Sequence, residues 1–390
     1  MTKRIIDQFA GPEVGPVDLL VIAGEHSGDE HAARMIRQFR RRHPTSVIVA
    51  LGGPALKRAG AQLLFDLTAS SVVGIFEVLK NYAFFKQLFE ETLRWIAVHQ
   101  PRAVCFVDYP GMNLRLAAAL REQKLSVKGG GRIKTLFYIS PQIWAWKAGR
   151  RFKMARTLDA LAVIFPFEVK CYADTSLAVE FVRHPFIEPD YAEPVAYDPA
   201  GPILLLPGSR KQAVERIFPE LIRGFQLFGE REAVVLYPSD DILQVLRAAN
   251  PPSNVRLLRI DDSGSTTEPF KASAVLTSSG TMSMHCALSG IPGAIVYRAN
   301  PLTYMIGRML VKIEYLGIAN LLLNEPMYPE FIQQDATPAA LADQLRLSIH
   351  DAARHERTAD QSRRLRRMLS QPGTNSAGDW LSRNTRAGTH

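Results

Sequence analysis

Short apolar runs rich in β-branched residues alternate along the first half of the chain with segments whose apolar positions recur at helical spacing. The runs predict strands at 17–23, 46–51, 63–65, 103–107, 133–139, 161–165 and 179–182. The periodic segments predict helices at 30–42, 76–98, 113–123 and 145–156. Strands that alternate with helices in this way form a parallel sheet with helices on both faces.

A proline-rich stretch without period, residues 184–202, interrupts this pattern and predicts a linker or domain edge. The pattern then resumes, with strands predicted at 203–206, 233–237, 255–259, 274–277 and 294–296 and helices at 213–228, 240–249 and 281–288. We therefore expect an α/β protein of two doubly wound Rossmann-like domains, residues 1–190 and 191–345, facing each other across a cleft. Residues 346–390 are expected to form helices that pack back on the first domain or on a partner chain, so a homodimer is one alternative.

Composition narrows the class of protein. The 390 residues suffice for two domains, and 47% apolar with 22% charged residues is typical of a globular protein. A net charge of +9 favours anionic partners, although it also serves solubility alone. The three cysteines are far apart, which predicts core thiols in a reducing compartment and no metal site. With neither a signal peptide nor a long apolar run, we expect a cytoplasmic protein that contacts a membrane at most peripherally.

Ligands of doubly wound sheets bind beyond the carboxyl ends of the strands, so the residues after each strand are candidates. The first strand is followed by Gly24, Glu25, Ser27 and Gly28, which favour a ligand-binding turn, with helix capping as the alternative. Asp108 directly follows an apolar strand and suits a general base, unless it is a helix cap or part of an ion pair.

Aromatic and basic residues occur together in two segments. Ser140 ends another strand and is followed by Trp144, Trp146 and a run of Lys and Arg. Two close tryptophans beside these cations favour a groove for an anionic, partly apolar ligand over a solvated helix face. The segment Phe76–Phe89 interleaves aromatic residues with lysines. It is either a core-facing helix or a contact with an anionic membrane surface.

Two predicted strands of the second half end in hydroxyl-rich glycine turns that open a helix. The first turn contains Gly208, Ser209 and Arg210, and the second contains Ser279, Gly280 and Thr281. Backbone N–H groups and the helix dipole at such a place bind phosphate, and two such turns together predict a diphosphate site. The spacing of a nucleotide-hydrolysing P-loop is absent, and simple helix capping is the alternative.

At these residues the sequence resembles the bacterial lipid-A-disaccharide synthase family, inverting glycosyltransferases of the GT-B type. The resemblance covers roughly residues 17–345, in stretches that include AGEHSGD, DYPGMNL, YISPQIWAWKAGRRFK, FPFE, LLLPGSRKQAVE and SSGTMSMHCAL. SPQIWAW and LPGSR are specific in combination, and no single stretch suffices. It implies transfer of 2,3-diacylglucosamine from its UDP derivative to the 6-hydroxyl of 2,3-diacylglucosamine 1-phosphate at the inner face of the cytoplasmic membrane. It also implies that Asp108 is the base, that His285 and Asn320 lie near the nucleoside, that Arg298 adds positive charge, and that no metal or cofactor is bound.

The sequence departs from the family's pattern at three positions. The family has an acidic residue in place of Gly111, a glycine in place of Arg183 and a glutamate in place of His285. A UDP-sugar epimerase, a glycosyltransferase with another lipid acceptor and a catalytically silent nucleotide-sugar-binding protein are therefore the alternatives. A nucleic-acid binder is disfavoured, because the basic residues accompany no base-reading module.

Overall fold

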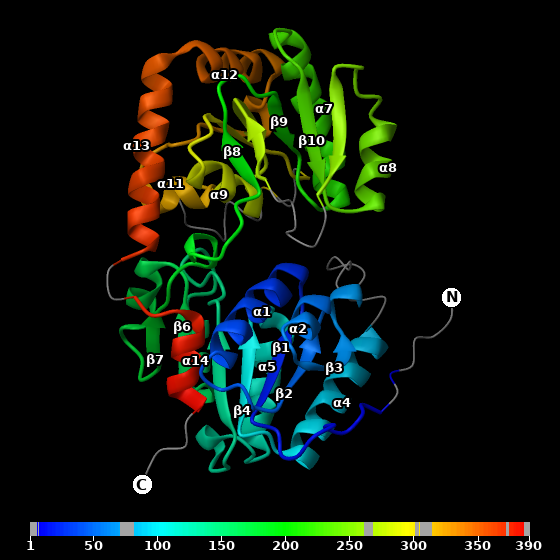
Figure 1. Cartoon of the computed structure of the whole chain (residues 1–390), viewed down its shortest axis with the longest axis vertical. Coiled ribbons are helices and arrows are strands. Elements are labelled where there is room, and N and C mark those ends of the chain that lie inside the picture. Colours follow the sequence, from blue (N-terminus) through cyan, green and yellow to red (C-terminus); the bar gives the residue numbers. More distant parts are fainter. Residues whose placement is uncertain are drawn as a thin grey trace. The chain divides into compact units, whose positions relative to one another are not determined.

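The chain divides into two compact units in a computed structural model that describes residues 6, 8–70, 82–260, 268–300, 304, 314–371 and 374–385. The first unit comprises Met1–Pro185 together with Gln371–His390, and the second comprises Phe186–Ser370 (Figure 1). Both have the alternating strands and helices that the apolar pattern predicts. No described helix is both long and apolar enough to cross a membrane.

The first unit is built on a seven-stranded parallel sheet in the order β3-β2-β1-β4-β5-β6-β7. Its strands are β1 (Leu19–Ala23), β2 (Ile48–Gly52), β3 (Gln62–Asp66), β4 (Ala103–Val107), β5 (Lys134–Tyr138), β6 (Ala160–Val163) and β7 (Ala178–Phe181). Its helices are α1 (His26–Arg40), α2 (Pro54–Arg58), α4 (Tyr82–His99), α5 (Pro110–Glu122), α6 (Arg150–Thr157) and α14 (Ala377–Thr385). Short 3₁₀ turns are η1 (Thr68–Ser70), η2 (Val127–Gly129), η3 (Pro166–Tyr172) and η4 (Pro185–Ile187), the last of which begins at the unit boundary.

The second unit contains a six-stranded parallel sheet in the order β11-β10-β9-β13-β14-β15. Its strands are β9 (Ile203–Leu206), β10 (Ala233–Tyr237), β11 (Val255–Arg259), β13 (Ala274–Thr277), β14 (Gly293–Tyr297) and β15 (Glu330–Ile332), and β8 (Val195–Tyr197) pairs separately with β12 (Phe270–Ala272). Its helices are α7 (Lys211–Phe228), α8 (Asp240–Ala248), α9 (Thr281–Leu288), α11 (Ile318–Leu323), α12 (Pro338–His350) and α13 (Ala352–Leu369), with the 3₁₀ turn η5 (Gln333–Asp335).

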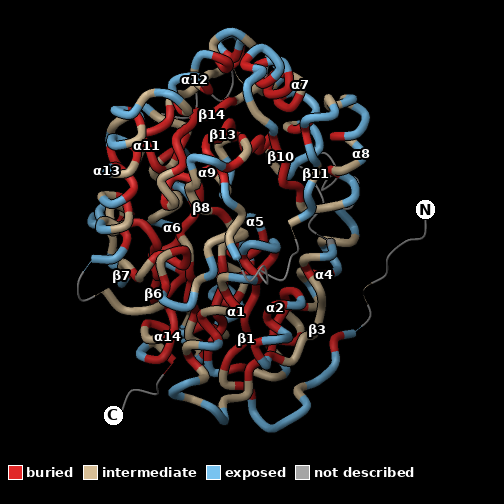
Figure 2. The backbone as a smooth tube through the Cα atoms, turned by 45° about the horizontal axis from the view of Figure 1, so that its top comes forward, coloured by how far each residue is buried: buried red, intermediate tan, exposed pale blue. Residues whose placement is uncertain are grey.

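The central strands are almost entirely apolar because helices cover both faces of each sheet. Every residue of β1, β4, β9 and β13 is buried (Figure 2). Continuous apolar runs of this kind distinguish doubly covered parallel sheets from sheets with one wet face. The prediction of two doubly wound α/β domains is confirmed.

The ends of the elements differ from the sequence-based expectation at a few places. Helix α1 starts at His26 instead of residue 30, so Gly28 lies inside the helix. Helix α6 starts at Arg150, because residues 145–149 form turns after β5. The predicted helix 76–98 is described only from Tyr82 onward, and residues 71–81 lie outside the described part of the chain.

The units also divide the chain differently from the expected ranges. The boundary falls at Pro185, five residues before the expected one at 190, and α12 and α13 belong to the second unit. In that unit the rings of Phe186 and Tyr191 pack against His285 of α9. Helix α14 instead packs on α1 of the same chain, where Arg42 and Asp379 form an ion pair at 2.7 Å.

Candidate functional site

Asp108 stands at the carboxyl end of the first unit's sheet in a strained turn. It follows β4, whose last residue Val107 pairs with Ala23 of β1 and Tyr138 of β5. Asp108 and Tyr109 both have positive φ, 45° and 48°. Two successive non-glycine residues in this left-handed region are rare, and such strain persists where the surrounding structure holds it in place.

Two contacts hold this turn. The Asn113 side-chain amide donates to the backbone oxygen of Asp108 at 2.8 Å. The Tyr109 ring lies against Gly24 so closely that a Cβ at Gly24 would be 2.2 Å from a ring carbon. Gly24 is therefore needed for the approach of the Tyr109 ring, and both contacts fix the direction in which Asp108 leaves the sheet.

Burial and a neighbouring carboxylate make Asp108 a stronger base than an ordinary aspartate. Desolvation, and after it the charge of Glu25, raise the pKa of Asp108 to about 6. A hydrogen bond from the backbone N–H of Tyr109 lowers this pKa, but only in part. A carboxylate with this pKa is ionised at neutral pH and still accepts a proton readily. Although Gly111 removes the acidic neighbour expected at that position, Glu25 supplies one from the adjacent strand end.

Of the residues after β1, some are exposed and available to a ligand, and others are buried and stabilise the fold. Glu25 is the exposed N-cap residue of α1, and Ser27 is exposed in its first turn. The buried Asp29 instead accepts hydrogen bonds from the backbone N–H groups of Gly53, Ala55 and Leu56 at 2.8, 2.8 and 3.2 Å. Asp29 thus caps the short helix α2 and has a structural role.

Replacing Asp29 by asparagine is expected to lower the free energy of unfolding by about 3 kcal/mol. The amide oxygen can still accept from Gly53 and Leu56, but without charge, and the new NH2 group leaves the buried N–H of Ala55 without an acceptor. Chemical denaturation at pH 7 measures the change in stability. The variant Asp18→Asn is a matched control, since Asp18 is partly exposed and caps a single backbone N–H, that of Val47. Equal stabilities of the two variants would contradict the structural role of Asp29.

A cluster of three aromatic rings, Trp144, Phe165 and Phe167, follows β5 and β6, and we call it the aromatic wall. The rings of Trp144 and Phe167 meet edge to face at 5.5 Å, and Phe165 stacks on Phe167 at 5.9 Å. The buried Ser140 does not present its hydroxyl for a ligand, because that hydroxyl pairs with Tyr172 Oη at 2.7 Å. Trp144 is half-buried. Its side chain and the backbone of Phe165 lie close to the carboxyl group of Glu168, a residue that the sequence pattern did not identify as a candidate.

The two glycine turns of the second unit lie side by side. They follow β9 and β13, neighbouring parallel strands in which Leu206 pairs with Thr277. The backbone N–H of Ser278 donates to the Leu206 oxygen at 2.8 Å. A Cβ at Gly208 would lie 3.2 Å from Ser278 Oγ. The turns thus bring the starts of α7 and α9 to one edge of the sheet.

Neither helix start is satisfied by a side-chain cap. The N-cap residues are Arg210 for α7 and Gly280 for α9, and no side-chain hydrogen bond caps either helix. Ser209, Arg210 and Thr281 are exposed, and their side chains form no hydrogen bond with the described residues. Simple capping therefore does not account for these turns, and their N–H groups and hydroxyls can bind an anion.

Three further candidates of the second unit have protein partners. Arg298 Nη1 pairs with the buried Glu220 at 2.5 Å, a carboxylate that it shares with Arg223. His285 is buried, its Nε2 lies 3.0 Å from Tyr191 Oη, and its ring stacks on that of Tyr191. Asn320 is fully buried and uses both hydrogens of its amide, on the Tyr328 and Glu330 oxygens. Asn320 is thus occupied in holding the loop before β15.

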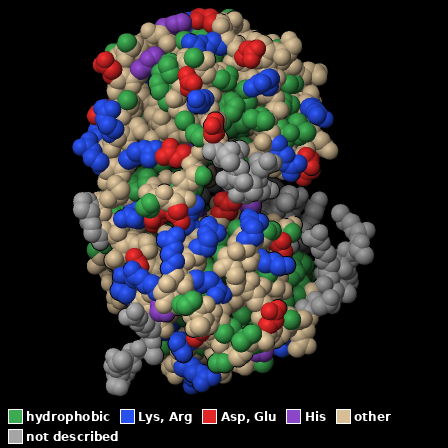
Figure 3. Space-filling model, viewed as in Figure 1, with side chains coloured by type: hydrophobic (Ala, Val, Ile, Leu, Met, Phe, Trp, Pro, Cys, Tyr) green, Lys and Arg blue, Asp and Glu red, His purple; other side chains and the backbone are tan. Residues whose placement is uncertain are grey.

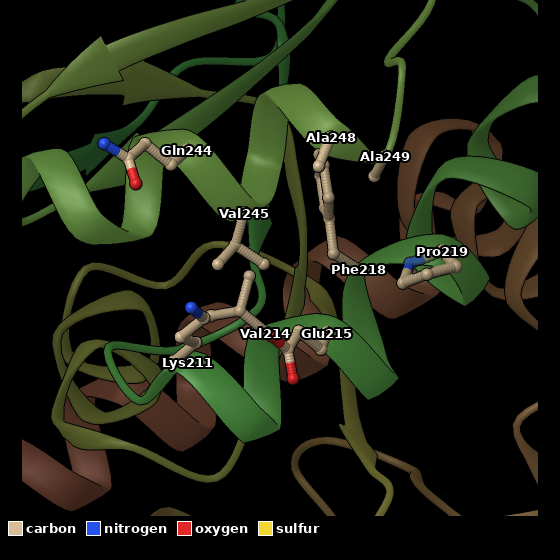
Figure 4. Close-up of a pocket in the computed structure, with 9 residues that line it drawn as sticks. All are labelled: Lys211, Val214, Glu215, Phe218, Pro219, Gln244, Val245, Ala248 and Ala249. Atoms are coloured by element: carbon tan, nitrogen blue, oxygen red, sulfur yellow. The ribbon is translucent and has the colours of Figure 1, made fainter.

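A separate groove of about 380 Å³ runs between α7 and α8 (Figure 4). Its lining is mostly apolar and includes Val214, Phe218 and Val245, with Lys211 at one end. The candidate residues of the two glycine turns do not line it. The groove is therefore distinct from the candidate anion site.

Comparison with known proteins identifies the family. Residues 19–383 match the lipid-A-disaccharide synthetase family. A lipid-A-disaccharide synthase of Geobacter sulfurreducens is 32% identical over 357 residues, which cover 87% of this chain and 90% of that protein.

Solved structures support the fold. The calicheamicin glycosyltransferase CalG4 has a TM-score of 0.57 at 15% identity and covers 96% of this chain and 100% of its own. A putative UDP-N-acetylglucosamine 2-epimerase from Listeria monocytogenes has a TM-score of 0.58 at 11% identity, with 95% and 94% covered. A transferase and an epimerase share this GT-B architecture, so the family assignment rests on the sequence match. The chain belongs to the lipid-A-disaccharide synthetase family of GT-B glycosyltransferases.

Proposed function

We propose that this glycosyltransferase performs its family's reaction with Asp108 as the general base and the two glycine turns as the diphosphate site. The family transfers 2,3-diacylglucosamine from its UDP derivative to the 6-hydroxyl of 2,3-diacylglucosamine 1-phosphate. The observation that supports the assignment of the base most directly is the half-buried Asp108, with its strained backbone and raised pKa.

The proposed reaction is a single displacement. Asp108 takes the proton of the acceptor hydroxyl, whose oxygen forms the new bond to C1 of the donor sugar. The bond between C1 and the diphosphate breaks, and UDP leaves with the electron pair. The helix starts after Gly208 and Gly280, together with Arg210, stabilise the negative charge on the leaving diphosphate.

A product assay tests this proposal. The purified chain is incubated with UDP-2,3-diacylglucosamine, with and without the acceptor, and products are identified by mass. We expect a disaccharide and UDP only when the acceptor is present. Conversion of the donor alone would indicate an epimerase, and no conversion in either mixture would indicate a silent nucleotide-sugar-binding protein.

We further propose that the enzyme contacts an anionic membrane surface, because both substrates carry acyl chains that partition into a bilayer. The described part of the segment Phe76–Phe89 gives little support as the contact, since Phe84, Phe85 and Phe89 pack against the core and Leu88 is fully buried. Residues 76–81 lie outside the described chain. A homodimer stays a prediction.

The region of α6 supports such a contact better. Trp146 and Phe152 are 39% and 45% exposed, and Lys147, Arg150 and Arg151 lie over their rings. Basic side chains are spread widely over the first unit, as the face in Figure 3 shows, so charge alone does not mark this place. We define the α6 patch as Trp146, Lys147, Arg150, Phe152, Lys153 and Arg156, which combine exposed aromatic rings with cations as membrane interfaces require.

Replacing both Trp146 and Phe152 by serine is expected to weaken binding to vesicles containing phosphatidylglycerol by about tenfold or more. Only the exposed part of each ring, 39% and 45%, is newly buried on the membrane, and together these parts contribute roughly 1.3–2.5 kcal/mol. Co-sedimentation measures this, and wild-type binding should fall with salt and on neutral phosphatidylcholine. Leu258→Ser is the control, because Leu258 is equally exposed, at 45%, on the second unit. Unchanged binding of the double variant would exclude the α6 patch.

A further inference from the structure

Three carboxyl groups stand at the carboxyl edge of the first unit's sheet. Glu25 follows β1 and Asp108 follows β4, the neighbouring strand. Glu168 lies in η3, which follows β6, and β6 is separated from β4 by β5 alone. The proposed mechanism assigns no role to Glu168.

Glu168 is deeply buried, and no residue in the described ranges is its counter-ion. Glu168 is 2% exposed, and its Oε2 accepts a hydrogen bond, at 3.1 Å, from the backbone N–H of Phe165. The backbone of Ile164 is a second donor that favours the charged form. Among the described residues, the indole N–H of Trp144 has no hydrogen-bond partner that meets the distance and angle limits of such a bond. It nevertheless lies close enough to the Glu168 carboxyl to lower the pKa of that group. None of the described Lys or Arg side chains forms an ion pair with Glu168.

We propose that Glu168 is a positioning residue for Asp108: held as a neutral carboxylic acid, it leaves Asp108 as the single charged member of the pair at neutral pH. This inference rests on the proposed role of Asp108 as the base. The groups that face Glu168 are Asp108 after β4 and Trp144 after β5, together with Cys171 and Tyr172 of η3 itself.

The electrostatics of the pair support this division. Desolvation is the main cause that raises the pKa of Glu168 to about 8, and the charge of Asp108 raises it further. The pKa of Asp108 is about 6, so between these values the pair carries one proton, on Glu168. Two carboxyl groups with separated pKa values allow one to act as an anion beside an acid. Ionisation of Glu168 would place an uncompensated negative charge beside the aromatic wall and near Asp108. We expect this charge to change the packing of the rings and the position of the Asp108 carboxylate.

The proton on Glu168 can be measured without catalysis. Carboxyl ¹³C NMR of the full chain labelled at glutamate follows the titration, and the signal lost in Glu168→Gln assigns it. We expect a pKa near 8 in the wild type and a lower value in Asp108→Asn, in which the neighbouring charge is absent. A Glu168 signal that titrates near 4, or one that Asp108→Asn does not move, would overturn the proposal. This readout is independent of whether Asp108 proves to be the base.

The second measurement is the pH profile of kcat. In the wild type, kcat at pH 9 should be about tenfold below kcat at pH 7, because roughly a tenth of Glu168 stays neutral one unit above its pKa. In Glu168→Gln this alkaline decline should be lost, while the rise near pH 6 remains. A folded Glu168→Gln that is inactive at every pH, or that keeps the alkaline decline, would contradict the proposed role, since glutamine preserves the shape of the neutral acid.

Discussion

Replacing Asp108 by asparagine is expected to lower kcat about a thousandfold, while the affinity for UDP stays the same. Asparagine keeps the size of the side chain but cannot accept the proton of the acceptor hydroxyl. UDP release measures kcat, and calorimetry with UDP measures the affinity. Because UDP is assigned to the second unit, a change at Asp108 of the first should not reach that site.

The matched control for this prediction is Asp240→Asn, which removes an exposed carboxylate paired with Arg259 on the second unit. It should leave both quantities unchanged. Unfolding midpoints of all variants show whether lost activity reflects lost structure. Full activity of Asp108→Asn would remove Asp108 from the mechanism.

The raised pKa of Asp108 also predicts the direction in which kcat changes with pH. The base works as a carboxylate, so kcat should rise through pH 6 and fall about tenfold for each unit below it. The charge of Glu25 contributes to the raised pKa of Asp108, so Glu25→Gln should move this rise to lower pH. A rise near pH 4 in the wild type would contradict the raised pKa of Asp108.

The apolar pattern was sufficient to locate the ends of most strands to within two residues, and with them the candidate turns, but it missed the three-residue strands β8, β12 and β15. Continuous runs such as 103–107 and 203–206 coincide with β4 and β9, because a doubly covered parallel strand must be apolar throughout. The topology then follows from connection rules, which bring the residues after neighbouring strands to one edge. These rules are sufficient to group the turn at Gly208 with the turn at Ser278, which the structure places in contact range.

Partners of single polar residues could not be predicted in this way. Arg298 and Asn320 suit a nucleotide site by residue type, yet the structure pairs one with Glu220 and the other with Tyr328 and Glu330. Glu168 was missed because a glutamate in a short aromatic stretch gives no periodic signal. Its burial depends on η3 folding over the end of β6, a tertiary contact that the local sequence does not encode.

Replacing Gly208 by alanine is expected to raise the Kd for UDP at least tenfold, which corresponds to about 1.4 kcal/mol. Gly208 has φ of 113°, a conformation that residues with a Cβ rarely adopt. The added Cβ would also lie 3.2 Å from Ser278 Oγ, so the first turn has to move away from the second. In the proposed site the diphosphate is bound by N–H groups from both helix starts, so separating them should lower the affinity even though no charge is lost.

A substitution at Gly229 separates two effects of an alanine at positive φ: general destabilisation of the fold, and displacement of the first glycine turn from the second. Gly229 also has positive φ, 71°, but it ends α7 at the opposite end of the helix from Gly208. Alanine at either position should lower the free energy of unfolding by roughly 1 kcal/mol or more. Only Gly208→Ala should also weaken UDP binding in calorimetry. Equal losses of affinity in both variants would mean that general destabilisation, and not the pairing of the two helix starts, controls how the donor is held.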